Sequence, residues 1–155
     1  GSPRQKVATF TASWPPAKSS LLLEGDPGTG KTHLAVGAIF DAWIRHGTHG
    51  LFWPVIDLLE RYRRTMSGDR AQETSEQIDA ALAKADLLVL DDLGAQRDTD
   101  YAGERLFSLI DARYSRQQAT IITTNLTLMQ LPDRINSRLK HGELAVLRGE
   151  DHRGL

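Results

Sequence analysis

One eight-residue segment, residues 25–32, restricts the fold of this chain more than any other feature. Its sequence GDPGTGKT fits the pattern G-x-x-x-x-G-K-[ST], and the apolar run Leu21-Leu22-Leu23 leads into it. Residues 31–45 suit a helix, so the segment joins a buried strand to a helix. Glycines there let backbone N–H groups turn towards a phosphate, and the helix N-terminus favours negative charge. The segment predicts a phosphate-binding loop; a flexible glycine turn is the weaker interpretation.

This loop also predicts how a nucleotide is held. We expect the Lys31 ammonium to reach the β- and γ-phosphates of ATP, and the Thr32 hydroxyl to ligate the accompanying Mg²⁺. The expected nucleotide-binding residues are Gly25, Asp26, Pro27, Gly28, Thr29, Gly30, Lys31, Thr32 and His33.

Two carboxylates follow the clearest buried strand, which we expect at residues 86–90. Ligands of open parallel sheets bind beyond the carboxyl ends of the strands, where Asp91 and Asp92 would project. We predict that Asp91 ligates Mg²⁺, through water, and that Asp92 orients the attacking water. The alternative is an ordinary solvated loop start or helix cap.

Strands alternate with helices along the chain, which predicts an α/β fold with a parallel sheet covered on both faces. Asn125 follows the strand expected at residues 119–123, so it should reach the same sheet edge as Asp91. Apolar residues occupy most of the circumference of helix 31–45, which we therefore expect to be largely buried. The three tryptophans are expected in the core; they are Trp14, Trp43 and Trp53. Further strands are expected at residues 51–53 and 144–147.

Length and composition fit one compact domain, since the chain has 155 residues, 40% of them hydrophobic. We expect residues 1–20 to be a leader that starts with a tag remnant, and residues 21–155 to be the folded core. A net charge of −1 excludes a global basic field for nucleic acid. The sequence shows no signal peptide and no apolar stretch of about 20 residues, so a cytoplasmic protein without membrane contact is expected.

A short basic segment offers a local site for nucleic acid. Arg61, Arg63 and Arg64 surround Tyr62 in the sequence. The arginines supply charge for phosphates, and the tyrosine supplies a ring for base stacking. We expect them to contact single-stranded DNA, although a solvated helix end explains the same residues.

Several motifs, taken in order, resemble one family. They are Gly25-x-x-Gly28-Thr29-Gly30-Lys31-Thr32-His33-Leu34-Ala35, Leu87-Leu88-Val89-Leu90-Asp91-Asp92-Leu93-Gly94, Thr123-Thr124-Asn125-Leu126 and Ser137-Arg138-Leu139. Together they resemble the AAA+ ATPases of the bacterial helicase-loader and transposition-helper group, of the DnaC, DnaI and IstB types. The resemblance spans residues 21–153.

The resemblance implies an αβα P-loop core with five parallel strands in the order 5-1-4-3-2. It implies that Asn125 is the sensor residue, and that Arg138 is an arginine finger reaching the γ-phosphate in a neighbouring subunit of a homo-oligomer. Arg153 is similar to the second sensing arginine, which acts on its own subunit's nucleotide. The catalytic set is therefore Lys31, Asp91, Asp92, Asn125 and Arg138.

The implied function is ATP hydrolysis in DNA replication or transposition, with a replicative helicase or a transposase as partner. Asp92 stands where most AAA+ proteins have glutamate, so turnover is expected to be slow. The family's helical lid and partner-binding N-terminal domain are not found in residues 21–155. Two alternatives stay open: a non-catalytic module that recruits a partner when ATP is bound, and a small-metabolite kinase, which the missing acceptor pocket disfavours.

Overall fold

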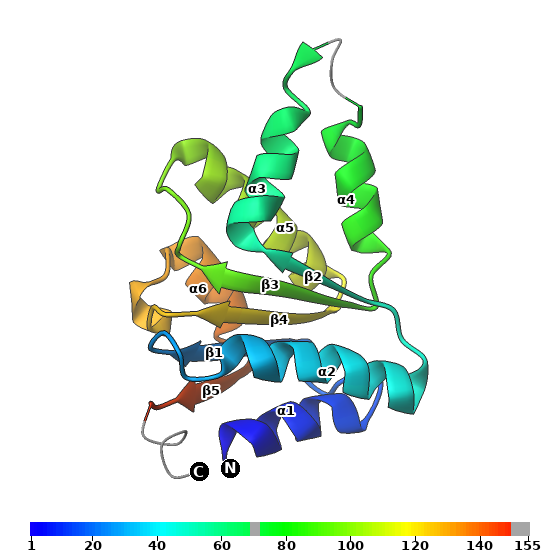
Figure 1. Ribbon diagram of the computed structural model, residues 1–155, viewed down its shortest axis with the longest axis vertical. Helices are drawn as coiled ribbons and strands as arrows, with labels where there is room; N and C mark the ends of the chain where they lie inside the picture. The colour runs from blue at the N-terminus through cyan, green and yellow to red at the C-terminus, as the bar shows by residue number, and fades with distance from the viewer. Residues whose placement is uncertain (69–71, 150–155) are drawn as a thin grey trace.

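The computed structural model describes residues 1–68 and 72–149 and contains one five-stranded sheet (Figure 1). All the strands are parallel, and they lie in the order β2-β3-β4-β1-β5. Counted from the other edge, this order is 5-1-4-3-2, so the expected topology is confirmed. The strands are β1 (Ser20–Gly25), β2 (Gly50–Pro54), β3 (Leu87–Leu93), β4 (Ala119–Thr124) and β5 (Glu143–Leu147).

Helices cover both faces of this sheet, as the alternating pattern predicts. One face carries α1 (Pro3–Ala12) and α2 (Lys31–His46). The other face carries α3 (Val55–Arg64), α4 (Ser75–Ala83), α5 (Asp100–Ser115) and α6 (Asp133–Leu139), with the short helix η2 (Leu128–Gln130) before α6. None of the described helices has the length and apolar character needed to cross a membrane.

The central strands supply side chains to two separate cores. In β1, Leu21 and Leu23 pack under α1 and α2, whereas Leu22 packs under the helices of the opposite face. This alternation follows from the two-residue repeat of a strand. Because both faces are covered, the strand is apolar along its length rather than alternating with polar residues.

Helix α1 lies inside the segment that we expected to be a leader. Ser2 and Gln5 form a capping box at its N-terminus, and Val7 and Phe10 are buried against the sheet. Only these two large apolar residues mark the helix as amphipathic, so hydrophobic periodicity did not reveal it. The helix packs beside α2 and next to the edge strand β5 (Figure 1).

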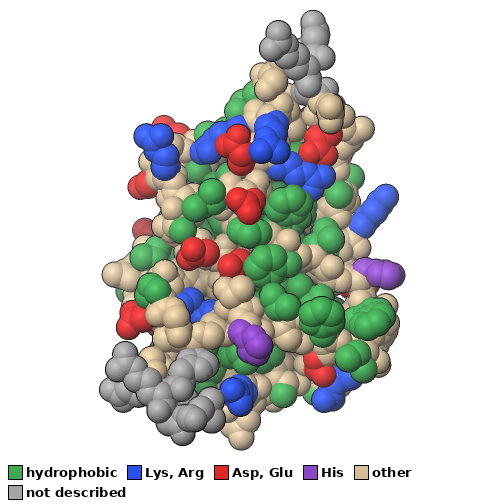
Figure 2. All heavy atoms as spheres, viewed as in Figure 1, with side chains coloured by type: hydrophobic (Ala, Val, Ile, Leu, Met, Phe, Trp, Pro, Cys, Tyr) green, Lys and Arg blue, Asp and Glu red, His purple; other side chains and the backbone are tan. Residues whose placement is uncertain are grey.

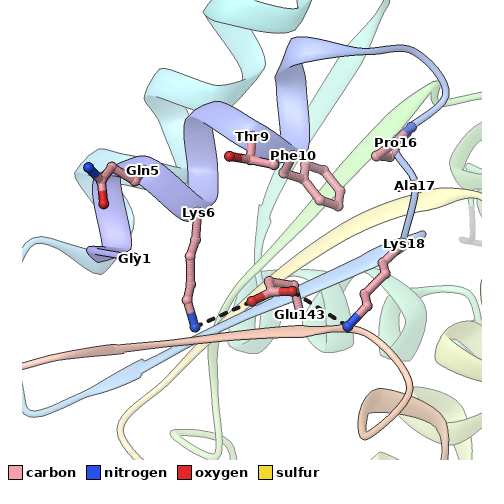
Figure 3. Close-up of a pocket in the computed structure, with 9 residues that line it drawn as sticks. All are labelled: Gly1, Gln5, Lys6, Thr9, Phe10, Pro16, Ala17, Lys18 and Glu143. Atoms are coloured by element: carbon pink, nitrogen blue, oxygen red, sulfur yellow. Dashed lines mark ion pairs between the residues drawn. The ribbon is translucent and has the colours of Figure 1, made fainter.

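Two lysines hold α1 and its following loop against β5. The Lys6 ammonium donates a hydrogen bond of 2.6 Å to the carbonyl oxygen of Leu144. Lys6 and Lys18 approach the Glu143 carboxylate from opposite sides, at 3.3 and 3.6 Å (Figure 3). A hollow of about 350 Å³ lies beside this cluster, also lined by Phe10.

Helix α2 is not largely buried, contrary to the expectation from its composition. Its sheet-facing side is made of small residues such as Ala35 and Ala38, which let the helix lie close to the strands. Phe40, Trp43 and Ile44 are 57%, 57% and 74% exposed, and hydrophobic side chains are visible over the C-terminal half of α2 (Figure 2). Trp43 is therefore a surface residue, and its expected place in the core was wrong.

A buried arginine connects the sheet to the helices at the amino ends of the strands, opposite the phosphate-binding loop. The Arg113 guanidinium, 2% exposed, donates hydrogen bonds of 2.8–3.1 Å to the Thr120 hydroxyl and to the carbonyl oxygens of Leu82, Ala85 and Ala119. Burial lowers the pKa of Arg113 to about 10, against a weaker opposing effect of Asp86. Its side chain thereby connects α5 to the ends of α4 and β4.

Candidate active site

The phosphate-binding loop connects the end of β1 directly to the start of α2. Gly28 and Gly30 have φ angles of +80° and +93°, values that glycine adopts without the strain other residues incur. A Cβ atom on Gly25 would lie 2.4 Å from the carbonyl oxygen of Leu147. The loop thus needs glycine for its backbone angles at two positions and for close packing at a third.

Lys31 lies inside the curl of this loop and is 7% exposed. Its ammonium donates hydrogen bonds to the carbonyl oxygens of Gly25 at 2.7 Å and Asp26 at 2.8 Å. Burial lowers the pKa of Lys31, and the nearby carboxylates of Asp92, Asp26 and Asp91 oppose that effect. A positive charge therefore sits at the mouth of the loop, where phosphate oxygens would bind.

Thr32 and Asp91 meet across the gap between α2 and β3. The Thr32 hydroxyl donates a hydrogen bond of 2.8 Å to Oδ1 of Asp91. A hydroxyl and a carboxylate are hard oxygen donors of the kind that Mg²⁺ takes alongside phosphate oxygens and water. These two residues fit the predicted metal site, although they come from segments 59 residues apart.

Both acidic residues lie within β3, which continues to Leu93 instead of ending at Leu90 as expected. The pairing register with β4 shifts between Leu90 and Leu93, so Asp91 and Asp92 together lie opposite one residue of β4. This is a β-bulge. Asp92 has a φ of +61°, in the left-handed region, and its side chain is exposed at the sheet edge.

Asn125 directly follows β4 and comes close to the phosphate-binding loop, as its position in the sequence predicts. It lines a hollow of about 470 Å³ together with Gly25, Asp26 and the end of β5. His33 is exposed in the first turn of α2. The structure thus brings loop, acidic pair and Asn125 to one edge of the sheet.

Arg138 lies near the amino ends of the strands, whereas its own phosphate-binding loop lies at their carboxyl ends. It lines a small hollow with Ser20 and Thr120, near the first residues of β1 and β4. Its guanidinium donates a hydrogen bond of 2.6 Å to Asp111 and lies 5.5 Å from the centre of the Phe107 ring. Within one subunit, this arginine is therefore not part of the site. The other predicted arginine, Arg153, lies outside the described residues.

The basic segment at the end of α3 makes ion pairs within the chain. Arg61 donates two hydrogen bonds to Glu73, at 2.7 and 2.9 Å, while Arg63 and Arg64 lie 3.9 and 4.0 Å from Glu60. Helices α3 and α4 stand side by side and extend away from the sheet, so these arginines are far from β5 (Figure 1).

Sequence reasoning missed one residue of the site, Thr123 in β4. Its hydroxyl lies 2.7 Å from Oδ1 of Asp91 and 2.8 Å from the backbone nitrogen of Asp92. The only sequence signal was a threonine two positions before Asn125, which did not show which strand residues it would contact.

Comparison with known proteins agrees with this geometry. The family model described as IstB-like ATP binding protein matches residues 1–138. The chain belongs to this IstB-like family. The matched range includes α1, the phosphate-binding loop, the acidic pair and Arg138.

Members of two functional groups are similar to this IstB-like chain. The replicative helicase loader DnaC of Escherichia coli K12 is 30% identical over 128 residues, which are 80% of this chain and 51% of that protein. A putative insertion sequence ATP-binding protein of Sinorhizobium fredii is 39% identical over 113 residues, or 73% of this chain and 36% of that protein. The chain thus spans about half, or less, of the length of these relatives.

Solved structures share the fold. The crystal structure of the DnaC helicase loader superposes with a TM-score of 0.80 at 28% identity, covering 92% of this chain and 86% of that one. DnaA from Aquifex aeolicus bound to AMPPCP gives a TM-score of 0.79 at 20% identity, covering 92% of this chain and 44% of the other. The second likeness concerns the fold alone.

Proposed function

We propose that this chain is an AAA+ ATPase domain that binds ATP with Mg²⁺ at residues 25–32 and hydrolyses it. The observation that carries the proposal is the meeting of Lys31, Thr32 and Asp91 at the carboxyl edge of the sheet, with a hydrogen bond of 2.8 Å between the last two. Membership of an ATP-binding family supports it.

Each residue has a distinct part in the proposed reaction. Lys31 exchanges its contacts with loop carbonyls for phosphate oxygens, and Thr32 and Asp91 hold Mg²⁺, which would neutralise charge on the phosphates. Asp92 accepts a hydrogen bond from the attacking water and orients it. Asn125, on the neighbouring strand end, donates a hydrogen bond to the γ-phosphate or the water.

Arg138 is proposed to act on the nucleotide of a neighbouring subunit. Its place at the far edge of the sheet supports action between subunits, because it cannot serve its own loop from there. A finger of this kind supplies transition-state charge in many nucleotide hydrolases. Arg153 is proposed to contact the nucleotide of its own subunit.

The biological role proposed is that of a helicase loader or a transposition helper. The similar proteins are replicative helicase loaders and an insertion sequence ATP-binding protein, so a replicative helicase or a transposase is the proposed partner. Single-stranded DNA is the proposed ligand of Arg61, Arg63 and Arg64. Arg64 is the most accessible, with 76% of its side chain exposed.

Thermal unfolding with and without ATP and Mg²⁺ tests nucleotide binding. A ligand at 100 times its dissociation constant stabilises a protein by about 2.7 kcal/mol. Lys31→Ala should lose this stabilisation, whereas Lys84→Ala, at an exposed lysine after α4, should keep it. Equal stabilisation of wild type and Lys31→Ala would contradict the proposed site.

Phosphate release as a function of protein concentration tests assembly. Hydrolysis should rise more than proportionally with concentration, and Arg138→Ala should remove most of it. Arg134→Ala is the matched control, since Arg134 lies on the same helix and also stacks on Phe107, at 4.3 Å. Strictly proportional activity, or equal loss in both variants, would count against action between subunits.

The alternative is an ATP-dependent recruitment module without hydrolysis. The short Asp92 side chain motivates it, because it reaches less far than the glutamate common at this place. ATP binding without any phosphate release, even at high protein concentration and with single-stranded DNA, would favour this alternative.

A further inference from the structure

One hydroxyl group contacts both residues of the bulge in β3. The backbone N–H of Asp92 donates a hydrogen bond of 2.8 Å to Oγ1 of Thr123. The Thr123 hydroxyl then has its own proton available, and it donates this to Oδ1 of Asp91 at 2.7 Å. Because Thr123 is 1% exposed, water does not compete strongly for these contacts.

The bulge is what makes this double contact possible. The extra residue of a bulge is left out of the regular ladder, and here the backbone N–H of Asp92 is bonded to a side-chain hydroxyl of β4. Here β3 has two residues, Asp91 and Asp92, where β4 has only Thr123. The left-handed φ of +61° at Asp92 is uncommon outside glycine, although aspartate tolerates it better than most residues.

We propose that Thr123 is a positioning residue that orients the Asp91 carboxylate towards Mg²⁺ and holds the backbone of Asp92 in its left-handed conformation. This inference rests on the proposed function. Oδ1 of Asp91 accepts hydrogen bonds from two hydroxyls, those of Thr32 and Thr123. A carboxylate has about four acceptor sites, so Asp91 keeps capacity for a metal ion or its water.

Thr32 and Thr123 contact Asp91 from two different elements, the start of α2 and the end of β4. If Thr32 ligates Mg²⁺, it does so through an oxygen lone pair, and its hydroxyl proton would stay available to Asp91. Thr32 would then orient Asp91 and ligate the metal at once. Thr123 comes from a different strand and has no such second task. Its contact to Asp91 therefore does not depend on how Thr32 is placed around the metal.

The test is the Mg²⁺ dependence of nucleotide binding, measured with a fluorescent ADP analogue. Thr123→Val removes the hydroxyl at nearly constant volume and should raise the Mg²⁺ concentration needed for half of the Mg²⁺-dependent binding by about 10–100-fold, the usual effect of losing a group that orients a ligand. Binding in EDTA should not change. Thr123→Ser should restore the wild-type Mg²⁺ requirement, and Thr123→Ala, which cannot overfill the site, should behave as Thr123→Val.

Thr124→Val is the matched control on the same strand. Thr124 is fully buried, and its hydroxyl also makes two hydrogen bonds, to the carbonyl of Leu93 and from the N–H of Leu126, but it contacts neither carboxylate. This variant should lose stability without changing the Mg²⁺ requirement. An unchanged Mg²⁺ requirement in both Thr123→Val and Thr123→Ala, or an equal shift in Thr124→Val, would overturn the inference.

These outcomes separate the two proposals. Wild-type protein that binds no nucleotide, with or without Mg²⁺, would refute the proposed function itself. Wild-type protein that binds nucleotide with a clear Mg²⁺ requirement, together with Thr123 variants that share it, would refute only the role of Thr123.

Discussion

Replacing Arg113 with methionine should destabilise the fold by an amount that the structure allows us to work out. The variant keeps an unbranched side chain but removes the Arg113 donor from three buried oxygens, the carbonyls of Ala85 and Ala119 and the Thr120 hydroxyl. The Leu82 carbonyl still accepts from the N–H of Ala85. At about 2 kcal/mol for each orphaned acceptor, the loss is about 6 kcal/mol.

Part of this loss is offset because the charge no longer has to be buried. The pKa of Arg113 is lowered from 12.5 to about 10, so the fold disfavours the charged form. At 1.36 kcal/mol per unit, removing the charge returns about 3 kcal/mol. Arg113→Met should therefore lower the free energy of unfolding by about 3 kcal/mol.

Urea unfolding followed by tryptophan fluorescence measures this quantity, and the melting temperature should fall by about 10 °C. Arg116→Met is the matched control, because Arg116 is exposed at the end of the same helix. It should change stability by less than about 0.5 kcal/mol. A loss below about 1 kcal/mol in Arg113→Met would refute the reasoning. The hydrogen bonds of Arg113 would then contribute almost no more free energy than the burial of its charge costs.

Three further predictions concern the site. Asp92→Asn should keep nucleotide affinity and the fold, since asparagine also tolerates a left-handed backbone, but phosphate release in a colorimetric assay should fall at least about 100-fold. Gly25→Ala should abolish nucleotide binding in calorimetry and lower the melting temperature, because its Cβ would lie 2.4 Å from the Leu147 carbonyl oxygen. The control Gly37→Ala, at an exposed position of α2 with open space around it, should keep both. Because burial lowers the pKa of Lys31, the fall of nucleotide affinity with rising pH should have its midpoint below pH 10.5, where the ammonium loses its proton. Lys31→Arg should be insensitive over that range, and a wild-type midpoint at or above pH 10.5 would contradict the lowered pKa.

The phosphate-binding loop could be predicted from sequence because its chemistry and its backbone demands fall on the same few adjacent residues. Glycines at positions 28 and 30 are needed for their φ angles, and Lys31 for its charge. The order of the strands could not be obtained from hydrophobic periodicity, because an apolar run marks a strand without showing which strands lie beside it. The resemblance to a family supplied it.

Features that depend on tertiary contacts could not be predicted from the sequence. The bulge at Asp92 is defined by how β3 pairs with β4, so the residues of β3 alone do not predict it. The apolar circumference of α2 predicted too much burial, because small residues such as Ala35 and Ala38 face the sheet while Phe40, Trp43 and Ile44 are exposed. Helix α1 carried a local signal in its Ser2 and Gln5 capping box, but too few large apolar residues to mark it as part of the core.

The two outer strands bear on how copies of this domain can meet. β5 has the Lys6 ammonium bonded to its Leu144 carbonyl, and β2 has only five residues and ends in Pro54, which has no N–H to donate. Short edges that carry lysine or proline are poor templates for a strand from another molecule. Growth of the sheet from one copy into the next is therefore discouraged at both sides, so contacts between copies would have to form through side-chain surfaces.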